Sequence, residues 1–233
     1  MGARVSGTLS HKHMSTQIQA LAGSPSRWGV REWTVYSVLK RIADVAVSLI
    51  LLIITVPVWI AIAIAIKLDS RGPVFFVQER VGFKGHRFPC IKFRTMQVDA
   101  EARLEEMRRR GDVVGPVYKL RRDPRVTRVG RVLRRTSLDE LPQLVNVLRG
   151  QMSLVGPRPC IPAHVQQFRS EDLIRQTAKP GLTCLWVIRG RSDGTVEGWM
   201  AADREYISRQ SFWLDAWILL KTVFIVLSCR GAY

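Results

Sequence analysis

The sequence lacks several short motifs by which common enzyme classes are recognised. It contains no G-x-x-x-x-G-K-[ST] phosphate loop, no G-x-S-x-G nucleophile elbow and no G-x-G-x-x-G fingerprint. Its four cysteines and four histidines are scattered, with no C-x-x-C pair and no spacing typical of a metal site. These absences remove support for P-loop hydrolases, serine hydrolases and zinc proteins, and we expect reduced, mostly buried thiols.

The sequence is also poor in acidic residues. Its 233 residues include 36 Lys and Arg but only 19 Asp and Glu, so the formal net charge is +17. Such an excess predicts an anionic partner, which could be nucleic acid, an anionic membrane surface or a phosphorylated small molecule. With 47% hydrophobic residues, the chain can form one main domain with a core.

One long apolar segment is present. Residues 45–66, VAVSLILLIITVPVWIAIAIAI, are 22 consecutive uncharged residues, enough to cross a bilayer of about 30 Å at about 1.5 Å per residue. The segment begins too far from the N-terminus for a removable signal peptide and lacks an A-x-A-like cleavage site. We therefore expect it to be a membrane segment of the working protein.

Pro57 and the flanking charges predict how this segment lies in the membrane. Pro57 removes a backbone donor and predicts a kink, and Thr55 is available to satisfy the carbonyl that it frees. The flanking basic residues are Arg27, Arg31, Lys40 and Arg41 before the segment, and Lys67, Arg71, Arg80, Lys84 and Arg87 after it. Both flanks are therefore expected on the cytoplasmic side, which favours a re-entrant helix broken at the proline over a single straight span.

The rest of the chain divides around this helix. Residues 1–39 predict a poorly ordered extension, residues 40–66 the re-entrant helix, and residues 67–233 a cytoplasmic domain on the membrane surface. Within that domain, residues 68–96 predict short strands and turns, and residues 99–111 a helix ended by glycine. We therefore expect a mainly α fold with short β segments (α+β), in a monotopic membrane protein.

Residues 212–228, FWLDAWILLKTVFIVLS, form a second apolar stretch. They carry Asp215 and Lys221, and Trp213 and Trp217 lie four residues apart, on one face of a helix. This pattern favours an amphipathic helix in the membrane interface. The alternative is a core helix of the domain.

Residues 137–144, SLDELPQL, place Asp139 and Glu140 side by side. Ser137 followed by Glu140 fits a capping box at a helix start, although Pro142 fits badly in a helix interior. The preceding RVTRVGRVLRR spaces basic residues at intervals of three and four, which predicts one basic stripe if the segment is helical. The residues of that stripe are Arg125, Arg128, Arg131 and Arg135, and the alternative is a solvated face that attracts lipid headgroups.

Adjacent carboxylates among arginines also suit phosphoryl chemistry. One carboxylate can attack phosphorus while the other helps to hold a divalent cation. Arg158 and Arg191 follow on turns rich in glycine and proline, and arginine binds phosphate oxygens bidentately. Nearby guanidinium groups are expected to keep Asp139 ionised, as a nucleophile must be.

Several stretches together resemble the bacterial sugar transferase family, the monotopic polyprenyl-phosphate phosphoglycosyl transferases. They cover nearly all of residues 40–233 in the family's order. The matching stretches are KRIADV with the apolar segment, KLDSRGPVFFVQERVGFKGHRFPCIKFRTM, RVTRVGRVLRRTSLDELPQLVNVLRGQMSLVGPRP, KPGLT through GRS, and the terminal RGAY. The extension before residue 40 lies outside the resemblance.

The resemblance implies an enzyme of the bacterial inner membrane, with its catalytic domain on the cytoplasmic face. Such an enzyme moves a sugar 1-phosphate from a nucleotide diphosphate sugar, expected to be a UDP-sugar, to polyprenyl (undecaprenyl) phosphate, releases UMP and initiates polysaccharide or glycoconjugate synthesis. By similarity, Asp139 is the nucleophile that carries a covalent phosphosugar, and Glu140 binds Mg²⁺. The residues expected at the phosphates are Arg134, Arg158 and Arg191, with Lys92 and Arg94 of KFRTM as weaker candidates.

Some positions depart from the family's pattern. Val56 stands where members often have serine, and Cys184, Val187 and Arg189 replace residues that are often glycine, glutamine and a small polar residue. These changes leave the sugar and the nucleotide open, as the sequence also leaves a homo-oligomer open. A nucleic-acid-binding module and a non-catalytic basic membrane-anchored scaffold are alternatives, but neither accounts for the apolar segment, the arginines and the acidic pair together.

Overall fold

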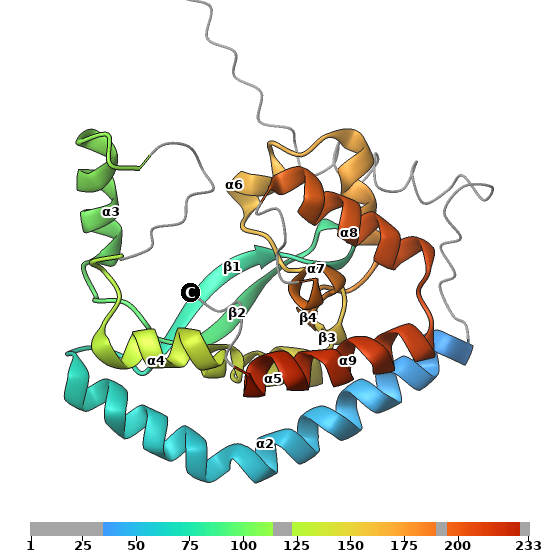
Figure 1. Cartoon of the computed structure of the whole chain (residues 1–233), viewed down its shortest axis with the longest axis horizontal. Helices are drawn as coiled ribbons and strands as arrows, with labels where there is room; N and C mark the ends of the chain where they lie inside the picture. Colours follow the sequence, from blue (N-terminus) through green and yellow to red (C-terminus); the bar gives the residue numbers. More distant parts are fainter. Residues whose placement is uncertain (1–34, 114–122, 190–194, 229–233) are drawn as a thin grey trace, which may run out of the picture.

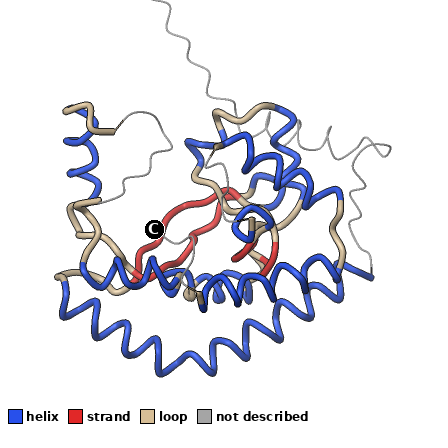
Figure 2. The backbone as a smooth tube through the Cα atoms, in the orientation of Figure 1, coloured by secondary structure: helices blue, strands red, loops and turns tan. Residues whose placement is uncertain are grey.

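The structure, a computed structural model, describes residues 35–113, 123–189 and 195–228. The elements in chain order are α2 (Val35–Asp69), β1 (Phe75–Val81), η1 (Phe83–Gly85), β2 (Arg87–Phe93), α3 (Ala100–Arg109), α4 (Arg128–Thr136), η2 (Leu138–Glu140), α5 (Gln143–Leu148), β3 (Ser153–Val155), α6 (Pro162–Val165), η3 (Ser170–Thr177), β4 (Gly181–Thr183), α7 (Leu185–Ile188), α8 (Val196–Ser208) and α9 (Phe212–Leu227), where η marks a 3₁₀ helix. Figure 2 shows mainly helices around short strands, which confirms the predicted mixture of α with a little β.

The helix α2 contains the whole apolar segment. It is long and apolar enough to cross a membrane, and only 11% of its most apolar window is buried in the protein. Figure 1 shows α2 as an arc below the rest of the chain, with both ends turned toward the domain. The Thr55 hydroxyl donates to the carbonyl of Leu51 at 2.6 Å. Our expectation that Thr55 satisfies the carbonyl freed by Pro57 is therefore wrong, because that carbonyl belongs to Ile53.

The first turns of α2 are fixed to the domain by polar side chains. α2 begins at Val35, ahead of residue 40, where the sequence analysis placed its start. Arg41 donates to the carbonyls of Val147 at 2.6 Å and Leu148 at 2.8 Å, at the C-terminal end of α5. That end of a helix leaves carbonyls unpaired and carries partial negative charge, so a guanidinium suits it. These bonds attach the start of α2 directly to α5.

Two small sheets lie above α2. β1 and β2 form an antiparallel hairpin in which Phe75 lies opposite Phe93, and this confirms the strands predicted after the membrane segment. β3 and β4 pair in parallel. Where β3 and β4 pair, the two backbone segments approach so closely that a Cβ on Gly181 would lie 2.1 Å from the backbone nitrogen of Gly156. Only glycine fits at this position.

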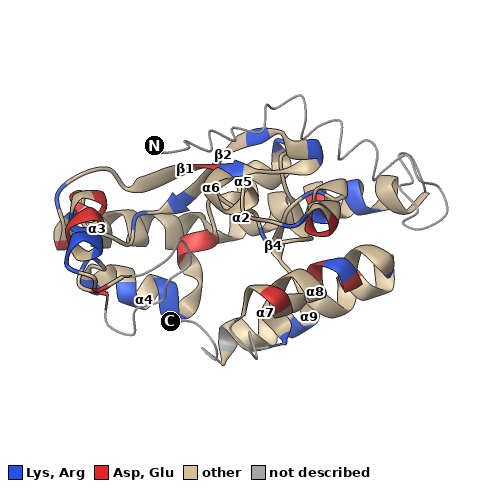
Figure 3. Cartoon of the chain, turned by 90° about the horizontal axis from the view of Figure 1, so that it is seen from above, with Lys and Arg blue, Asp and Glu red and all other residues tan. Residues whose placement is uncertain are grey.

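The predicted charged helices are both present. α3 confirms the helix expected over residues 99–111, and Gly111 follows it with a φ of +79°. α4 carries three of the four arginines of the expected stripe, but Arg125 precedes the helix, is buried and pairs with Asp123 at 2.7 Å. The prediction of one stripe is therefore wrong for Arg125. Figure 3 shows charged residues gathered on α3 and α4 at one end of the molecule.

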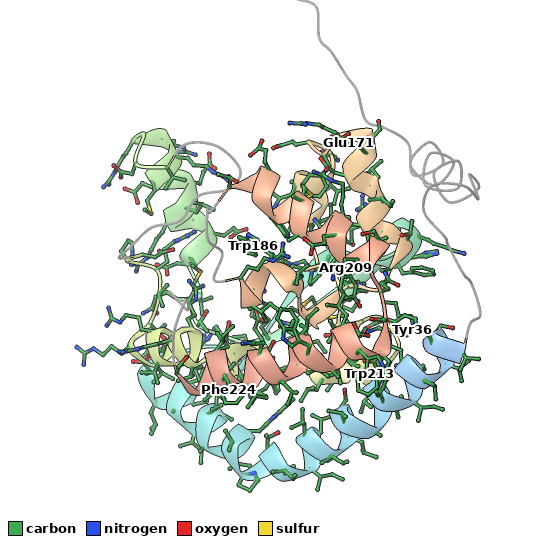
Figure 4. The ribbon with its side chains drawn as sticks, turned by 45° about the vertical axis from the view of Figure 1, so that its right-hand side comes forward. Tyr36, Glu171, Trp186, Arg209, Trp213 and Phe224 are labelled. Carbon is green, nitrogen blue, oxygen red and sulfur yellow. The ribbon has the colours of Figure 1, made fainter. Side chains whose placement is uncertain are left out.

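α9 has two different faces. Ile218 is fully buried in the main core, in a cluster that includes Leu144 and Val147 of α5. On the outer side, Trp213 is 81% exposed and Phe224 is 70% exposed, near the two ends of the helix in Figure 4. The core-helix alternative is therefore correct for one face of α9, while the other face leaves large apolar side chains outside the protein.

Three of the four cysteines lie in the described residues. Cys90, Cys160 and Cys184 are free thiols and buried, as the sequence predicted. Cys229 lies outside the described residues.

Candidate active site

Asp139 and Glu140 lie on η2, a single 3₁₀ turn between α4 and α5. Ser137 ends α4 in the left-handed conformation with a φ of 57°, which turns the chain sharply before the acidic pair. Within this described segment, the Ser137 side chain makes no capping hydrogen bond. The capping-box interpretation is therefore wrong, because the Glu140 carboxylate is bound elsewhere.

Glu140 is held by two cations from different parts of the fold. Lys92 of β2 and Arg158, in the loop after β3, each donate to Oε1 of Glu140 at 2.9 Å. Burial alone raises the pKa of the Glu140 carboxyl, but the charges of Arg158 and Lys92 outweigh burial and hold that pKa well below its usual range. Glu140 in turn raises the pKa of the Arg158 guanidinium. The three groups form one fixed ionic cluster.

Asp139 lies in the same cluster, but its carboxylate accepts no hydrogen bond from the described residues. Burial and the charge of Glu140 raise the pKa of Asp139 to about 6, against the opposing charges of Lys92, Arg134 and Arg158. The arginines lower this pKa, but burial and Glu140 outweigh them; a pKa of about 6 still leaves Asp139 mainly ionised at pH 7, as expected. Above pH 6 the group is mainly an ionised carboxylate that accepts no hydrogen bond from the described residues.

The other predicted phosphate ligands are placed unequally. Arg134, in the last turn of α4, donates through Nε to the Thr95 hydroxyl at 2.9 Å and is close enough to influence Asp139 electrostatically. Arg94 is buried and bonds the carbonyls of Ser70 and Arg71, in the turn after α2. The structure thus brings Lys92, Arg134 and Arg158 to the acidic pair and gives Arg94 a different set of partners. Arg191 lies outside the described residues.

The sequence analysis did not assign Arg80 and Gln143 to the site. A hollow borders Glu140, and it is lined by Arg80, Cys90, Lys92, Glu140, Gln143, Arg158 and Pro159. Burial, and then the charge of Arg158, lower the pKa of Arg80. The one sequence signal for Arg80 was the alternation of side chains along β1, which puts Arg80 and Gln78 on the same strand face. In the structure Arg80 donates to Gln78 at 2.5 Å.

The residues present fit a magnesium ion that arrives with phosphate. Among the described residues, no group of three or more His, Cys, Asp and Glu could hold a metal alone. Mg²⁺ is commonly bound by one or two carboxylates together with substrate phosphates. The Asp139 carboxylate and Oε2 of Glu140, which neither of Glu140's two bonds uses, supply that donor set.

Comparisons with known proteins match the chain to one family and to several curated relatives. The model of a family described as "Bacterial sugar transferase" matches residues 35–229. The UDP-galactose-lipid carrier transferase of Erwinia amylovora is 41% identical over 237 residues, which cover 100% of this chain and 47% of that protein. This chain thus spans about half the length of that relative.

Two further relatives are matched over most of their own length. The UDP-glucose:undecaprenyl-phosphate glucose-1-phosphate transferase of Caulobacter vibrioides is 42% identical over 202 residues, covering 83% of this chain and 72% of that protein. The exopolysaccharide production protein ExoY of Rhizobium meliloti is 39% identical over 202 residues, covering 83% of this chain and 88% of that protein.

Proposed function

The chain belongs to the bacterial sugar transferase family, and from this premise we propose that it is a phosphoglycosyl transferase. It moves a sugar 1-phosphate from a UDP-sugar to undecaprenyl phosphate, forms undecaprenyl diphosphate sugar and UMP, and thereby starts the assembly of a polysaccharide or glycoconjugate. The observation that carries the proposal is the acidic pair, in which Glu140 is bound by Lys92 and Arg158 while Asp139 accepts no hydrogen bond from the described residues.

The names of the relatives support the two substrates. The relative from Erwinia amylovora is named for UDP-galactose, and the relative from Caulobacter vibrioides for UDP-glucose, undecaprenyl phosphate and the transfer of glucose 1-phosphate. The relative from Rhizobium meliloti is named for exopolysaccharide production. The net charge of +17 suits an enzyme whose donor, acceptor and products all carry phosphate.

In the first proposed step, a carboxylate oxygen of Asp139 attacks the sugar-proximal phosphorus of the donor. A bond forms between that oxygen and phosphorus, and the bond from phosphorus to the bridging oxygen breaks. UMP leaves with the bridging oxygen, and the sugar phosphate remains as an acyl phosphate on Asp139. Because the carboxylate attacks as an anion, the step needs no proton transfer.

The surrounding cations lower the cost of bringing two anions together. Arg158 and Arg134 present guanidinium groups and Lys92 an ammonium group, which can bind the phosphate oxygens of the donor and stabilise their charge in the transition state. Glu140 and Asp139 would hold Mg²⁺, which supplies further positive charge at the phosphates when bound. Glu140 also fixes Lys92 and Arg158 in place before the donor arrives.

In the second proposed step, a phosphate oxygen of undecaprenyl phosphate attacks the same phosphorus. The phosphorus–oxygen bond to Asp139 breaks, and this restores the carboxylate. Two displacements at one phosphorus explain why a single nucleophile next to a single cationic cluster suffices for both substrates.

The acceptor is a lipid, so the site must face the membrane. We propose that α2 is a re-entrant helix broken at Pro57, that the outer face of α9 lies in the membrane interface, and that the domain lies on the cytoplasmic face. The arc of α2 in Figure 1 and the exposed Trp213 and Trp217 support this placement. Cysteines engineered before residue 40 and after residue 67 should then be labelled from the same side of the membrane. Labelling from opposite sides would mean a true span.

The decisive experiment is a donor screen with purified protein, Mg²⁺, undecaprenyl phosphate and a panel of UDP-sugars, scored by UMP release. One donor should give UMP with the wild-type chain. Asp139→Asn should lower that rate more than ~10³-fold, since it removes the nucleophile at nearly constant shape. It should remain folded and membrane-bound. Retained turnover in this variant would contradict the proposed role, and no UMP from any donor would favour the scaffold alternative.

A further inference from the structure

The loop that carries Arg158 is held at every main-chain carbonyl. The carbonyl of Pro157 accepts from Gly181 N at 2.9 Å, and that of Cys160 accepts from Val81 N at 2.8 Å. The carbonyl of Pro159 accepts from Arg80 at 3.3 Å, and that of Arg158 accepts from Arg175. Three different parts of the fold, β1, η3 and β4, therefore fix four successive peptide units, and the two prolines further restrict the backbone.

Arg175 makes the most extensive of these contacts. Besides the Arg158 carbonyl, its guanidinium donates to the sulfur of Cys160 and lies over the ring of Trp199 at 4.7 Å and that of Phe168 at 5.3 Å. Arg175 is almost fully buried. A buried arginine with this set of contacts has one orientation, because turning it would leave several donors unpaired.

The charge of Arg175 is balanced by Asp203 of α8, at 2.8 Å, with both side chains at most 5% exposed. Breaking a buried ion pair from one side leaves the other charge uncompensated, so Asp203 determines whether Arg175 can stay in place. A chain of contacts thus runs from Asp203 through Arg175 to the peptide of Arg158, and through the Arg158 side chain to Glu140.

We infer that Arg175 and Asp203 are positioning residues, which hold the loop of Pro157–Cys160 so that the Arg158 guanidinium meets Glu140 and the donor phosphate. Neither residue touches the substrate. They act through the Arg158 backbone, and the inference about their effect on rate rests on the proposed function.

The test uses a matched pair of variants. Asp203→Asn removes the charge that balances Arg175. The control is Asp172→Asn, which breaks a neighbouring pair between η3 and α8, that of Asp172 with Arg204. Asp172 is also buried, but the described residues show no hydrogen bond from its pair to the loop. Both variants should lower the melting temperature, and only Asp203→Asn should disturb the loop.

The first readout does not depend on activity. Hydrogen exchange of the Val81 and Gly181 amides, which bond the loop carbonyls, should accelerate in Asp203→Asn and stay near the wild-type rate in Asp172→Asn. Equal acceleration in both variants, or none in either, would overturn the inference even if the protein transfers no sugar phosphate. If Asp203→Asn does not fold, Arg175→Lys serves instead, because it retains a buried cation that cannot bond all these partners at once.

The second readout is a double-mutant cycle on UMP release. Asp203→Asn should lower the rate at saturating donor by up to ~10²-fold, the effect of misplacing a reacting group by about 1 Å. In an Arg158→Gln background the same change should cost little, because the group that it positions is gone. Fully additive losses would show that Asp203 acts through stability alone. A wild-type chain without UMP release would refute the proposed function and leave the exchange result to decide this inference.

Discussion

Two buried carboxylate clusters in this protein have similar components and different arrangements. At the junction of α2, α8 and α9, Asp215 accepts from Lys40 at 2.6 Å and from Tyr36 and Tyr206 at 2.8 Å each, so both of its oxygens are occupied. At η2, Glu140 accepts from Lys92 and Arg158 on one oxygen only, and the adjacent Asp139 accepts no hydrogen bond from the described residues. A fully bonded carboxylate fastens elements together, whereas one without donors keeps an oxygen available for chemistry.

The two clusters also differ in what surrounds them. The Asp215 cluster joins the start of α2 to the domain, and its donors are two phenols and one ammonium group. The cluster at η2 contains two carboxylates and at least three cations, and burial leaves the pKa of Asp139 raised to about 6. Excess cationic charge next to an unbonded anion is an arrangement that a phosphate ligand would complete. The difference between the two clusters leads to three predictions, from the largest expected effect to the smallest.

Glu140→Gln should lower the rate of UMP release on the order of 10²-fold, because the cations lose the carboxylate that holds them. It should also shift the pH dependence. The rate requires ionised Asp139, so in the wild type it should rise with pH through about 6. The charge of Glu140 is the second cause of that raised pKa, so its removal should move the acid limb to lower pH.

Glu140→Asp is the matched control for this shift, because it retains the charge. Its acid limb should stay near the wild-type position even if its rate falls. An acid limb that moves equally in both variants would show that Glu140 does not set the ionisation of Asp139.

Asp215→Asn should reduce the free energy of unfolding by about 1–3 kcal/mol, because a buried hydrogen-bonded acceptor is disturbed. The rate per folded molecule should remain that of the wild type. Asp99→Asn, which breaks the exposed pair with Arg103, should cost at most about 1 kcal/mol. Denaturant unfolding in detergent measures both. A loss of rate in Asp215→Asn beyond its loss of folded protein would erase the distinction between the two clusters.

The smallest effect concerns the outer face of α9. In vesicles with brominated lipids, Trp213 and Trp217 should be quenched because they are exposed on a surface expected to meet lipid. Replacing both with Phe should reduce the quenching. The control replaces Trp186 and Trp199, which stack at 5.6 Å within the domain, and should leave the remaining tryptophans strongly quenched. Equal quenching across the two double variants would place α9 away from the lipid.

The sequence predicted the local elements of this fold better than its long-range contacts. β-favouring runs separated by glycine and proline predicted the strands β1 and β2, and a glycine stop predicted the end of helix α3, because each depends on neighbouring residues. The capping box failed at Ser137 because Lys92 and Arg158, 48 and 18 residues from Glu140, bind the side chain that the box requires. A pattern of neighbouring residues cannot show that distant cations compete for the Glu140 side chain.

The same limit applies to the arginines. Arg134 and Arg158 were identified on family motifs and lie at the acidic pair, while Arg80 was noted only as a flanking charge. Arg125 was placed in a helix by its spacing, yet it precedes that helix and pairs with Asp123 two residues away. The spacing of arginines shows which of them can share a helix face. Only the folded structure shows which of them pair with a carboxylate instead.

The bonds from Arg41 to the last carbonyls of α5 link α2 closely to the candidate active site. α5 is six residues or about 9 Å long, and only Leu141 and Pro142 lie between it and the end of η2. One short helix therefore connects Arg41 of α2 to the turn that carries Asp139. Under the proposed placement of α2 in the bilayer, this connection would also set the distance between Asp139 and the acceptor phosphate, and an extra turn in the first half of α2 would change that distance.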